Sequence, residues 1–170
     1  VSCNFKINKT LAAELNNIFL EVVIANGFNS EALKILKKKK NLRLIDATKF
    51  MMNNSERLNS ANGTILTQTE DIKKFNIKKF KIVSKKKPNQ SQLKNLIFAF
   101  NVCKHVKSNG IVLASQESTV GIGSGQPSRL DSCQIAIDKM NKFQLLNDEV
   151  VAASDAFFPF VDGMEKLIQA

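Results

Sequence analysis

The chain has 170 residues, 44% of them hydrophobic and 24% charged, which allows one domain or two small ones with an apolar core. Its formal net charge of +10 favours anionic partners, namely nucleic acid, a nucleotide, a polyanionic cofactor or a membrane surface. The lysines are spread along the chain, and Tyr and Trp, the usual stacking partners of bases, are absent. We therefore interpret the charge as a solvated surface and expect no nucleic-acid partner.

The cysteines and the single histidine argue against a metal site. Cys3, Cys103 and Cys133 lie far apart in the sequence, and a zinc site would need carboxylates to complete it. Reduced thiols are typical of a cytoplasmic protein, which is the location we expect. No signal peptide is visible and no apolar run approaches the length of a membrane span, so no membrane partner is expected.

Hydrophobic spacing predicts the elements of the first half of the chain. Apolar residues recur at helical intervals from Thr10 to Ala25, and Gly27 lies just past that helix. Ser30 is a suitable cap for a second helix, whose four terminal lysines suit a helix C-terminus. The predicted order is a helix over 10–25, a helix over 31–40, a strand over 42–46, a loop over 47–62, strands over 63–69 and 80–84, and a turn over 85–90.

The second half alternates helices and strands more clearly. A helix from Ser91 is predicted to bury one apolar face, made of Leu93, Leu96, Ile97, Phe100 and Cys103. Pro127 suits the first turn of a later helix. The predicted order is a helix from 91, a hairpin of strands over 111–114 and 119–123, a helix near 127, a strand over 150–154 and a helix from 162. Such alternation predicts a layered α/β domain.

The glycine-rich stretch VGIGSGQPSR, residues 120–129, has two interpretations. Glycines at a strand exit, followed by Ser128 and Arg129 at a helix N-terminus, would make a good anion site. The spacing GxGxG is neither a P-loop nor a dinucleotide fingerprint, however. A tight turn from strand to helix would use the same glycines without any ligand, so both interpretations stay open.

The stretch CKHVKSNG, residues 103–110, carries the only histidine. His105 is the one side chain with an unperturbed pKa suited to general base chemistry near neutrality, but no triad partner or second ligand supports it. A structural or surface role is the stronger interpretation. Asn109 either ends the helix or presents an amide at a strand mouth, where it could hold a substrate amide or an oxyanion.

The stretch ASDAFFPFVDG, residues 153–163, clusters aromatic side chains directly after a predicted strand. Phe157, Phe158 and Phe160 around Pro159 would fit a flat ring ligand, and a buried corner would need the same residues. Asp162 could simply cap the helix that follows.

Taken together and in order, KSN, GIGxGQxSR and SDAFFPF followed by DG closely resemble the transformylase part of the AICAR transformylase/IMP cyclohydrolase family. The runs IFLEVVIANGF, SEALKILKKKKNLRL and KIVSKKKP resemble the same family, so the resemblance covers essentially all 170 residues. It implies a layered α/β/α unit similar to cytidine deaminase, without its zinc site, and a homodimeric complete protein. It also implies formyl transfer from the cosubstrate 10-formyltetrahydrofolate to the amine of AICAR in purine biosynthesis.

The resemblance implies roles for seven residues of this chain. Asn109 matches the asparagine of the catalytic centre, while Ser128 and Arg129 match residues that hold the nucleotide. The ribonucleotide and folate pockets would be lined by Phe157, Phe158, Pro159 and Asp162.

The sequence also departs from the family pattern. The catalytic Lys-His motif and the cyclohydrolase domain are absent, so we interpret residues 1–170 as a fragment of the transformylase domain, inactive alone. Ser124, Pro127 and Val161 stand where alanine, a longer side chain and arginine are usual, respectively. The alternative hypotheses are a basic module that binds RNA or another polyanion, and an unrelated nucleotide-binding α/β protein.

Overall fold

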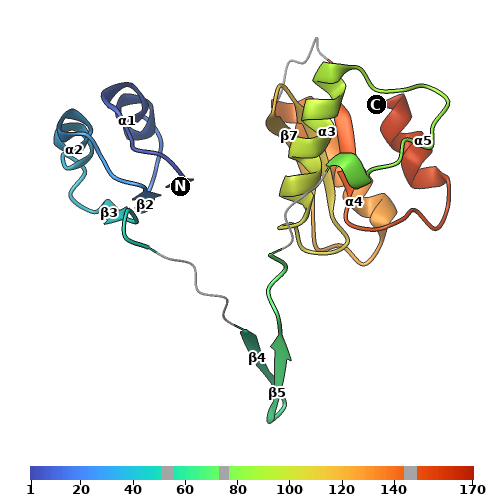
Figure 1. Cartoon of the computed structure of the whole chain (residues 1–170), viewed down its shortest axis with the longest axis horizontal. Coiled ribbons are helices and arrows are strands. Elements are labelled where there is room, and N and C mark those ends of the chain that lie inside the picture. Colours follow the sequence, from blue (N-terminus) through green and yellow to red (C-terminus); the bar gives the residue numbers. More distant parts are fainter. Residues whose placement is uncertain (51–55, 73–76, 144–148) are drawn as a thin grey trace. The chain divides into compact units, whose positions relative to one another are not determined.

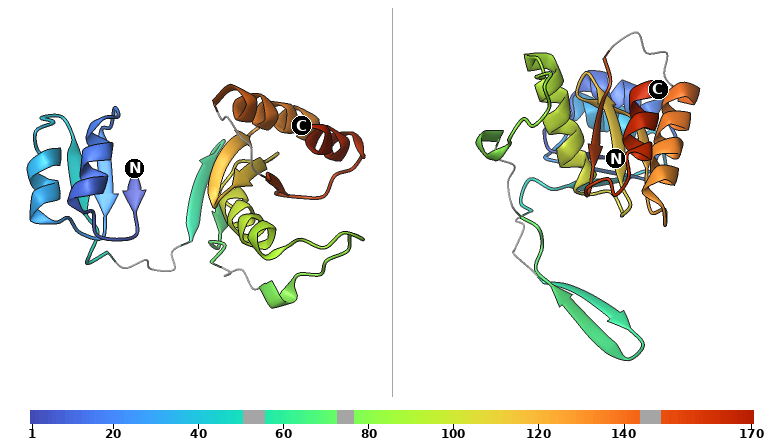
Figure 2. Two further views of the ribbon diagram at one scale, coloured as in Figure 1. Left: turned by 90° about the horizontal axis from the view of Figure 1, so that it is seen from above. Right: turned by 90° about the vertical axis from the view of Figure 1, so that its right-hand side faces the viewer.

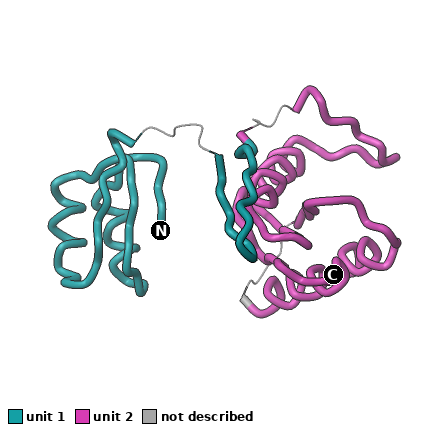
Figure 3. Tube along the Cα trace, turned by 90° about the horizontal axis from the view of Figure 1, so that it is seen from below, with its two compact units in different colours: residues 1–71 teal, residues 72–170 magenta. Residues whose placement is uncertain are grey.

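A computed structural model describes residues 1–50, 56–72, 77–143 and 149–170. The chain divides into two compact units, Val1–Asp71 and Ile72–Ala170, shown in different colours in Figure 3. Both combine helices with strands, so the expected α/β class is confirmed. Across the described residues, none of the helices is long and apolar enough to cross a bilayer.

The first unit begins with a parallel three-stranded sheet in the order β1-β2-β3 (Figure 1). Helices alternate with its strands along the chain, as parallel connections require. The buried side chains of Val23 and Ala25 form its core together with residues of both helices. The elements are β1 (Ser2–Cys3), α1 (Lys9–Asn16), β2 (Val22–Ala25), α2 (Ser30–Leu36) and β3 (Arg43–Asp46).

The predicted helix over 10–25 is wrong in its second half. Helix α1 ends at Asn16, and Val22–Ala25 form the central strand β2, which pairs with β1 and β3. The error arises because a short apolar run has the same hydrophobic spacing in a buried strand as in a helix. The strand over 42–46 is confirmed as β3, whereas α2 ends at Leu36, so the four lysines at 37–40 follow the helix.

The first unit also contains a hairpin of β4 (Arg57–Ala61) and β5 (Thr64–Gln68). The strand predicted over 63–69 is confirmed as β5, but the loop predicted over 47–62 is wrong where β4 forms, and residues 51–55 lie outside the described residues. Asn62 and Gly63 turn the chain with φ of 49° and 78°. An Asn-Gly pair between strands is a strong hairpin signal, and the sequence analysis missed it.

The second unit is built on an antiparallel sheet in the order β7-β6-β8. Its strands are β6 (Ile111–Ser115), β7 (Ser118–Gly123) and β8 (Val151–Ser154). The predicted hairpin and the predicted final strand are therefore confirmed. No strand forms over 80–84, which follows the short 3-10 helix η1 (Ile77–Lys79).

Helices cover both faces of this sheet (Figure 2, right). Ile111 and Leu113 of β6 pack into the cluster that includes the buried residues of α4 (Arg129–Phe143). Val112 and Ala114, which point to the opposite face, pack with Ala99 of α3 (Gln90–Cys103). Helix α5 (Asp162–Gln169) lies against α4. The second unit is thus layered as helix, sheet and helix, while a specific likeness to cytidine deaminase stays a prediction.

Helix α3 confirms the helix predicted from Ser91 but only part of its predicted buried face. Asn89 and Gln92 form a reciprocal capping box that fixes its start. The fully buried residues of α3 are Asn95, Ala99 and Cys103, whereas Phe100 is 42% exposed. The ring of Phe100 instead packs nearly perpendicular to that of Phe80, with the ring centroids 5.4 Å apart.

Candidate functional site

The glycines of residues 120–129 are explained by close packing. A Cβ added to Gly121 or Gly123 would overlap backbone carbonyl groups of α4, at Ala136 and Ser132 respectively. Only glycine therefore lets β7 lie this close to the helix. Gly125 adopts a φ of +68°, and its N–H donates to the Lys107 carbonyl at 2.9 Å. Gly121 and Gly123 thus serve close packing of β7 on α4 and Gly125 serves the turn, so all three glycines are accounted for without a ligand.

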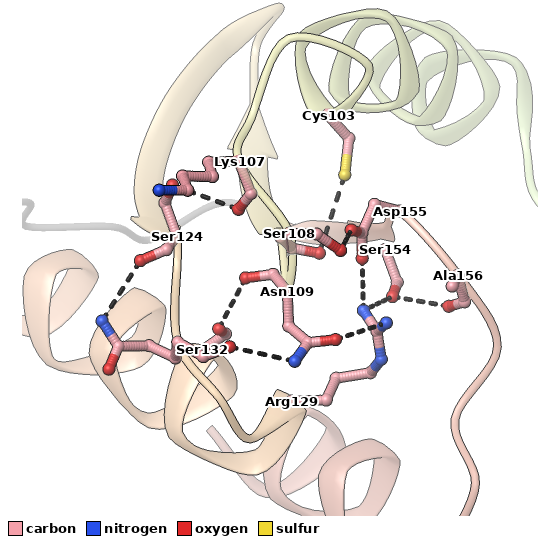
Figure 4. A network of polar contacts seen from close by, with 12 residues as sticks. Cys103, Lys107, Ser108, Asn109, Ser124, Arg129, Ser132, Ser154, Asp155 and Ala156 are labelled. Carbon is pink, nitrogen blue, oxygen red and sulfur yellow. Dashed lines mark hydrogen bonds and ion pairs between the residues drawn. The ribbon is translucent and has the colours of Figure 1, made fainter. Parts of the chain in front are cut away.

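This turn is bonded to the loop that contains Asn109 (Figure 4). The side-chain Nδ2 of Asn109 donates to the carbonyl oxygens of Gln126 at 2.9 Å and Pro127 at 3.0 Å. The Ser132 hydroxyl on α4 donates to the Asn109 carbonyl oxygen at 2.7 Å. Helix α4 begins at Arg129, so Pro127 precedes it rather than lying in its first turn. Asn109 also lies beyond the end of α3, in the loop leading into β6.

Arg129 connects this loop to the end of β8. Its Nη1 donates to the Ser154 hydroxyl at 2.8 Å and to the Asp155 carboxylate, and its Nη2 donates to Oδ1 of Asn109 at 2.9 Å. Its guanidinium carbon lies 5.9 Å from the centre of the Phe158 ring, within the range of a cation–π contact. The guanidinium therefore joins three segments that are far apart in the sequence.

The Arg129–Asp155 ion pair is largely enclosed. The two side chains are 10% and 17% exposed, respectively. Burial of the Asp155 carboxyl acts to raise its pKa, but hydrogen bonds from Ser108 and Arg129 outweigh burial, and its pKa lies below the ordinary value. Asp155 is therefore ionised near neutral pH and gives Arg129 a fixed anionic partner.

These contacts determine which way the Asn109 amide faces. The carbonyls of Gln126 and Pro127 can only accept hydrogen bonds, and the guanidinium of Arg129 can only donate them. Nδ2 must therefore face the carbonyls, where both of its hydrogens are used. Oδ1 keeps one lone pair beyond its bond to Arg129. Within these contacts the side chain has acceptor capacity left on Oδ1 and no amide hydrogen left over.

All seven candidate site residues line one pocket of about 370 Å³. Phe157 and Phe160 are 81% and 73% exposed, so the aromatic stretch does not form a buried corner. Phe158 is half-buried and packs against the cluster beneath α4. The residues brought together are Asn109, Ser128, Arg129, Phe157, Phe158, Pro159 and Asp162.

Asp162 is the first residue of α5 and not its cap. The N-cap position is Val161, and the Asp162 carboxylate accepts a hydrogen bond from the N–H of Gly163 at 2.7 Å. Gly163 is buried, and a Cβ there would lie 2.9 Å from the Phe158 ring. The helix start therefore fixes the position of that ring in the pocket.

Sequence reasoning missed the residues that hold the site together. Ser108, Ser154 and Asp155 each bond to another member of the network but were not chosen as site residues. The sequence offered one signal for this contact, namely an aspartate directly after a predicted strand and an arginine at the start of a predicted helix. His105, by contrast, is exposed in the turn after α3, as the surface interpretation predicted.

The thiols of the second unit are buried. Burial, followed by the nearby negative charge of Asp155, raises the pKa of Cys103 to about 11. Burial also raises the pKa of Cys133. In the part of the chain that the structure describes, no three His, Cys, Asp or Glu side chains group as metal ligands would.

The sequence model of the AICARFT/IMPCHase bienzyme family matches residues 1–139. The chain belongs to this family. Among its relatives, the bifunctional purine biosynthesis protein PurH of Ligilactobacillus salivarius is 43% identical over 167 residues, which are 97% of this chain and 32% of the relative. PurH of Lactobacillus acidophilus is 41% identical with the same coverage, and PurH of Oceanobacillus iheyensis is 39% identical over 100% of this chain and 33% of the relative.

Membership of the AICARFT/IMPCHase bienzyme family confirms the resemblance drawn from the three motifs. It excludes an unrelated nucleotide-binding protein. The chain spans about a third of the length of these relatives.

Proposed function

We propose that this chain forms one wall of an AICAR transformylase site, which transfers a formyl group from 10-formyltetrahydrofolate to the amine of AICAR. The observation that carries the proposal is the single pocket that gathers all seven residues chosen from the family motifs. These residues come from segments that lie apart in the sequence, so their meeting is a property of the fold. Family membership supports the same reaction.

The nucleophile of this reaction is weak, so the reaction depends on its alignment. The amine nitrogen forms a bond to the formyl carbon, the bond from that carbon to the folate nitrogen breaks, and a proton moves from the amine to the folate nitrogen. The AICAR amine is delocalised into its ring, so positioning supplies much of the rate. We propose that the free lone pair on Oδ1 of Asn109 accepts a hydrogen bond from an N–H of this amine. That bond would orient the lone pair of the amine nitrogen toward the formyl carbon.

The remaining pocket residues fit the binding of flat, anionic ligands. Phe157 and Phe158 offer apolar ring faces for a heterocycle, beside Pro159. Ser128 lies just before the N-terminus of α4, where N–H groups favour an anion such as the phosphate of the nucleotide. Asp162 offers a carboxylate acceptor to N–H groups of the folate ring. Arg129 contributes positive charge, although its bonds to Asp155 and Asn109 occupy much of the guanidinium.

The proposed site needs further residues to be complete. The described lining of the pocket includes no histidine or lysine to accept the proton of the amine. We propose that this base, the rest of the site and the cyclohydrolase belong to the parts of the complete protein outside this chain. We expect that complete protein to be a homodimer, as the family resemblance implies.

The test measures tetrahydrofolate formation from 10-formyltetrahydrofolate and AICAR. We expect turnover by the complete protein that carries this chain and negligible turnover by the 170-residue chain alone. Turnover by the chain alone at the rate of the complete protein would contradict its role as one wall. A complete protein without transformylase activity, together with salt-dependent binding of the chain to random RNA, would favour the polyanion-binding alternative instead.

A further inference from the structure

We propose that Asp155 is a positioning residue for this reaction, which acts through Arg129 to fix the orientation of the Asn109 carboxamide. The inference rests on the proposed formyl transfer and adds a residue that the family motifs did not single out. It is carried by an unbroken series of side-chain contacts from the end of β8 to the loop before β6 (Figure 4).

The Asp155 carboxylate is held at both of its oxygens. Oδ1 accepts from Arg129 and Oδ2 accepts from the hydroxyl of Ser108. The backbone N–H of Asp155 also donates to the carbonyl of Gly110 at 3.2 Å. The anchor of the series is therefore bonded to the same loop that carries Asn109, so the two ends are fixed relative to each other.

Arg129 transmits this placement because its guanidinium is planar and rigid. The two hydrogens on Nη1 have two acceptors, the Asp155 carboxylate and the Ser154 hydroxyl. Ser154 in turn donates to the carbonyl of Ala156 at 2.7 Å, so its oxygen presents a lone pair to the arginine. With Nη1 fixed, the plane of the group directs an Nη2 hydrogen at Oδ1 of Asn109, 2.9 Å away.

Asn109 is the element that this placement controls. Its Nδ2 would stay bonded to the two carbonyls, but Oδ1 has Arg129 as its donor within the network. If the guanidinium turned away, Oδ1 would lose this donor, and the carboxamide would be free to tilt about the bonds of Nδ2. The acceptor proposed for the substrate amine would then be misaligned, while the apolar ring contacts would remain.

This arrangement differs from a purely structural ion pair in its kinetic consequence. A structural role predicts lower stability with normal turnover of the folded fraction. A positioning role predicts a lower kcat with little change in KM, because the aromatic residues and Ser128 still bind the ligands. It also predicts that a carboxylate restored at the same position recovers part of the lost rate.

The kinetic test compares Asp155→Asn with wild type in the complete protein, at saturating AICAR and 10-formyltetrahydrofolate. We expect kcat to fall on the order of 100-fold, as misplacement of a reacting group by about 1 Å does. Asp155→Glu should recover about tenfold of that loss, because it restores an anionic partner for Arg129. The matched control is Asp131→Asn, which removes the same charge from an exposed residue of α4 and should leave kcat unchanged.

A second measurement keeps the inference testable if the wild-type protein proves inactive. In isotope-labelled chain, the side-chain amide hydrogens of Asn109 should be protected from exchange, because both are bonded to carbonyls. Asp155→Asn should shift the Asn109 amide signals, and Asp131→Asn should not. If the Asn109 signals shift in Asp155→Asn but the wild-type protein shows no turnover, the proposed reaction is refuted while the contact from Asp155 to Asn109 is supported.

Two results would overturn the inference. One is unchanged Asn109 amide signals in a folded Asp155→Asn chain. The other is a kcat within about twofold of wild type for Asp155→Asn in an active complete protein. If Asp155→Asn fails to fold, Ser154→Ala removes the other acceptor of Nη1, and the same two readouts apply to it.

Discussion

The two units contain ion pairs of the same kind in opposite surroundings. In the first unit, Lys9 and Glu31 approach to 4.0 Å with side chains that are 67% and 63% exposed. In the second unit, Arg129 and Asp155 are in direct contact with side chains that are 10% and 17% exposed. Water screens the first pair, whereas protein partners cover most of both side chains in the second.

The enclosed pair marks a place where the fold holds side chains in a fixed geometry despite a cost in stability. An enclosed pair costs desolvation, so it persists only where further hydrogen bonds compensate. Around Arg129 and Asp155 those bonds come from Ser108, Asn109 and Ser154. Around Lys9 and Glu31 the structure describes no comparable network. Two members of the enclosed network, Asn109 and Arg129, also line the pocket of the family motifs, and the exposed pair lies apart from them in the sequence.

The largest expected difference between the two units comes from removing the cation of each pair. Arg129→Met should lower the free energy of unfolding of the second unit by about 1–2 kcal/mol, because it leaves the partly covered Asp155 carboxylate without its cation. Lys9→Met should lower that of the first unit by less than about 0.5 kcal/mol, because its pair is exposed. Hydrogen exchange resolved by unit measures both. Equal losses in the two variants would refute the contrast.

The next effect separates a glycine needed for packing, Gly123 at the end of β7, from a glycine needed for the turn, Gly125. Gly123→Ala should destabilise the second unit by about 2–3 kcal/mol, because the added Cβ meets the backbone of α4. Gly125→Ala is the control: it has room for a Cβ but a φ of +68°, and it should cost about 1 kcal/mol. Thermal unfolding of both variants gives the comparison. A smaller loss for Gly123→Ala than for Gly125→Ala would show that close packing is not what selects this glycine.

Acid should weaken the enclosed pair in a defined direction. The pKa of Asp155 is lower in the folded chain than its ordinary value of 3.8, so its contribution to stability is present above that pH. The contribution is lost as the pH falls through the folded pKa. The difference in unfolding free energy between wild type and Asp155→Asn should thus be constant at neutral pH and shrink in strong acid. A difference that grows on acidification would contradict this linkage.

The smallest effect concerns thiol chemistry in the two units. Cys3 of the first unit is half-buried, whereas Cys103 and Cys133 of the second are buried with raised pKa values. A thiol reagent near neutral pH should label Cys3 first and reach the other two only when the second unit opens. In a Cys3→Ser variant the fast labelling should disappear. Fast labelling that persists in that variant would show that the second unit opens readily.

The two units also differ in how far their folds follow from the sequence. In the second unit, the apolar stripe along one face predicts α4, and two short apolar runs with a polar turn between them predict the β6–β7 hairpin. Local patterns were therefore enough for these elements. In the first unit, Val22–Ala25 become the central strand of a parallel sheet, a choice made by partners far along the chain. Hydrophobic spacing within one segment does not contain that information.

The site shows the same limit. Motif order was enough to choose Asn109, Arg129 and Phe158, because the family resemblance links them. The spacing alone did not reveal that Asp155 and Ser108 would hold them, since these contacts join segments up to 47 residues apart. Nor could composition reveal how the Asn109 carboxamide is oriented, with Nδ2 on the carbonyls of Gln126 and Pro127 and Oδ1 on Arg129.

The most direct test of the central claim is turnover by Asn109→Ala in the complete protein that carries this chain. The measurement is the rate of tetrahydrofolate formation at saturating AICAR and 10-formyltetrahydrofolate, with wild type and Asp131→Asn alongside. Loss of the acceptor should lower kcat of the folded protein at least about 100-fold. Thermal unfolding is measured alongside, because the variant also loses three side-chain hydrogen bonds. A folded Asn109→Ala protein with wild-type kcat would contradict the assignment of this pocket to formyl transfer.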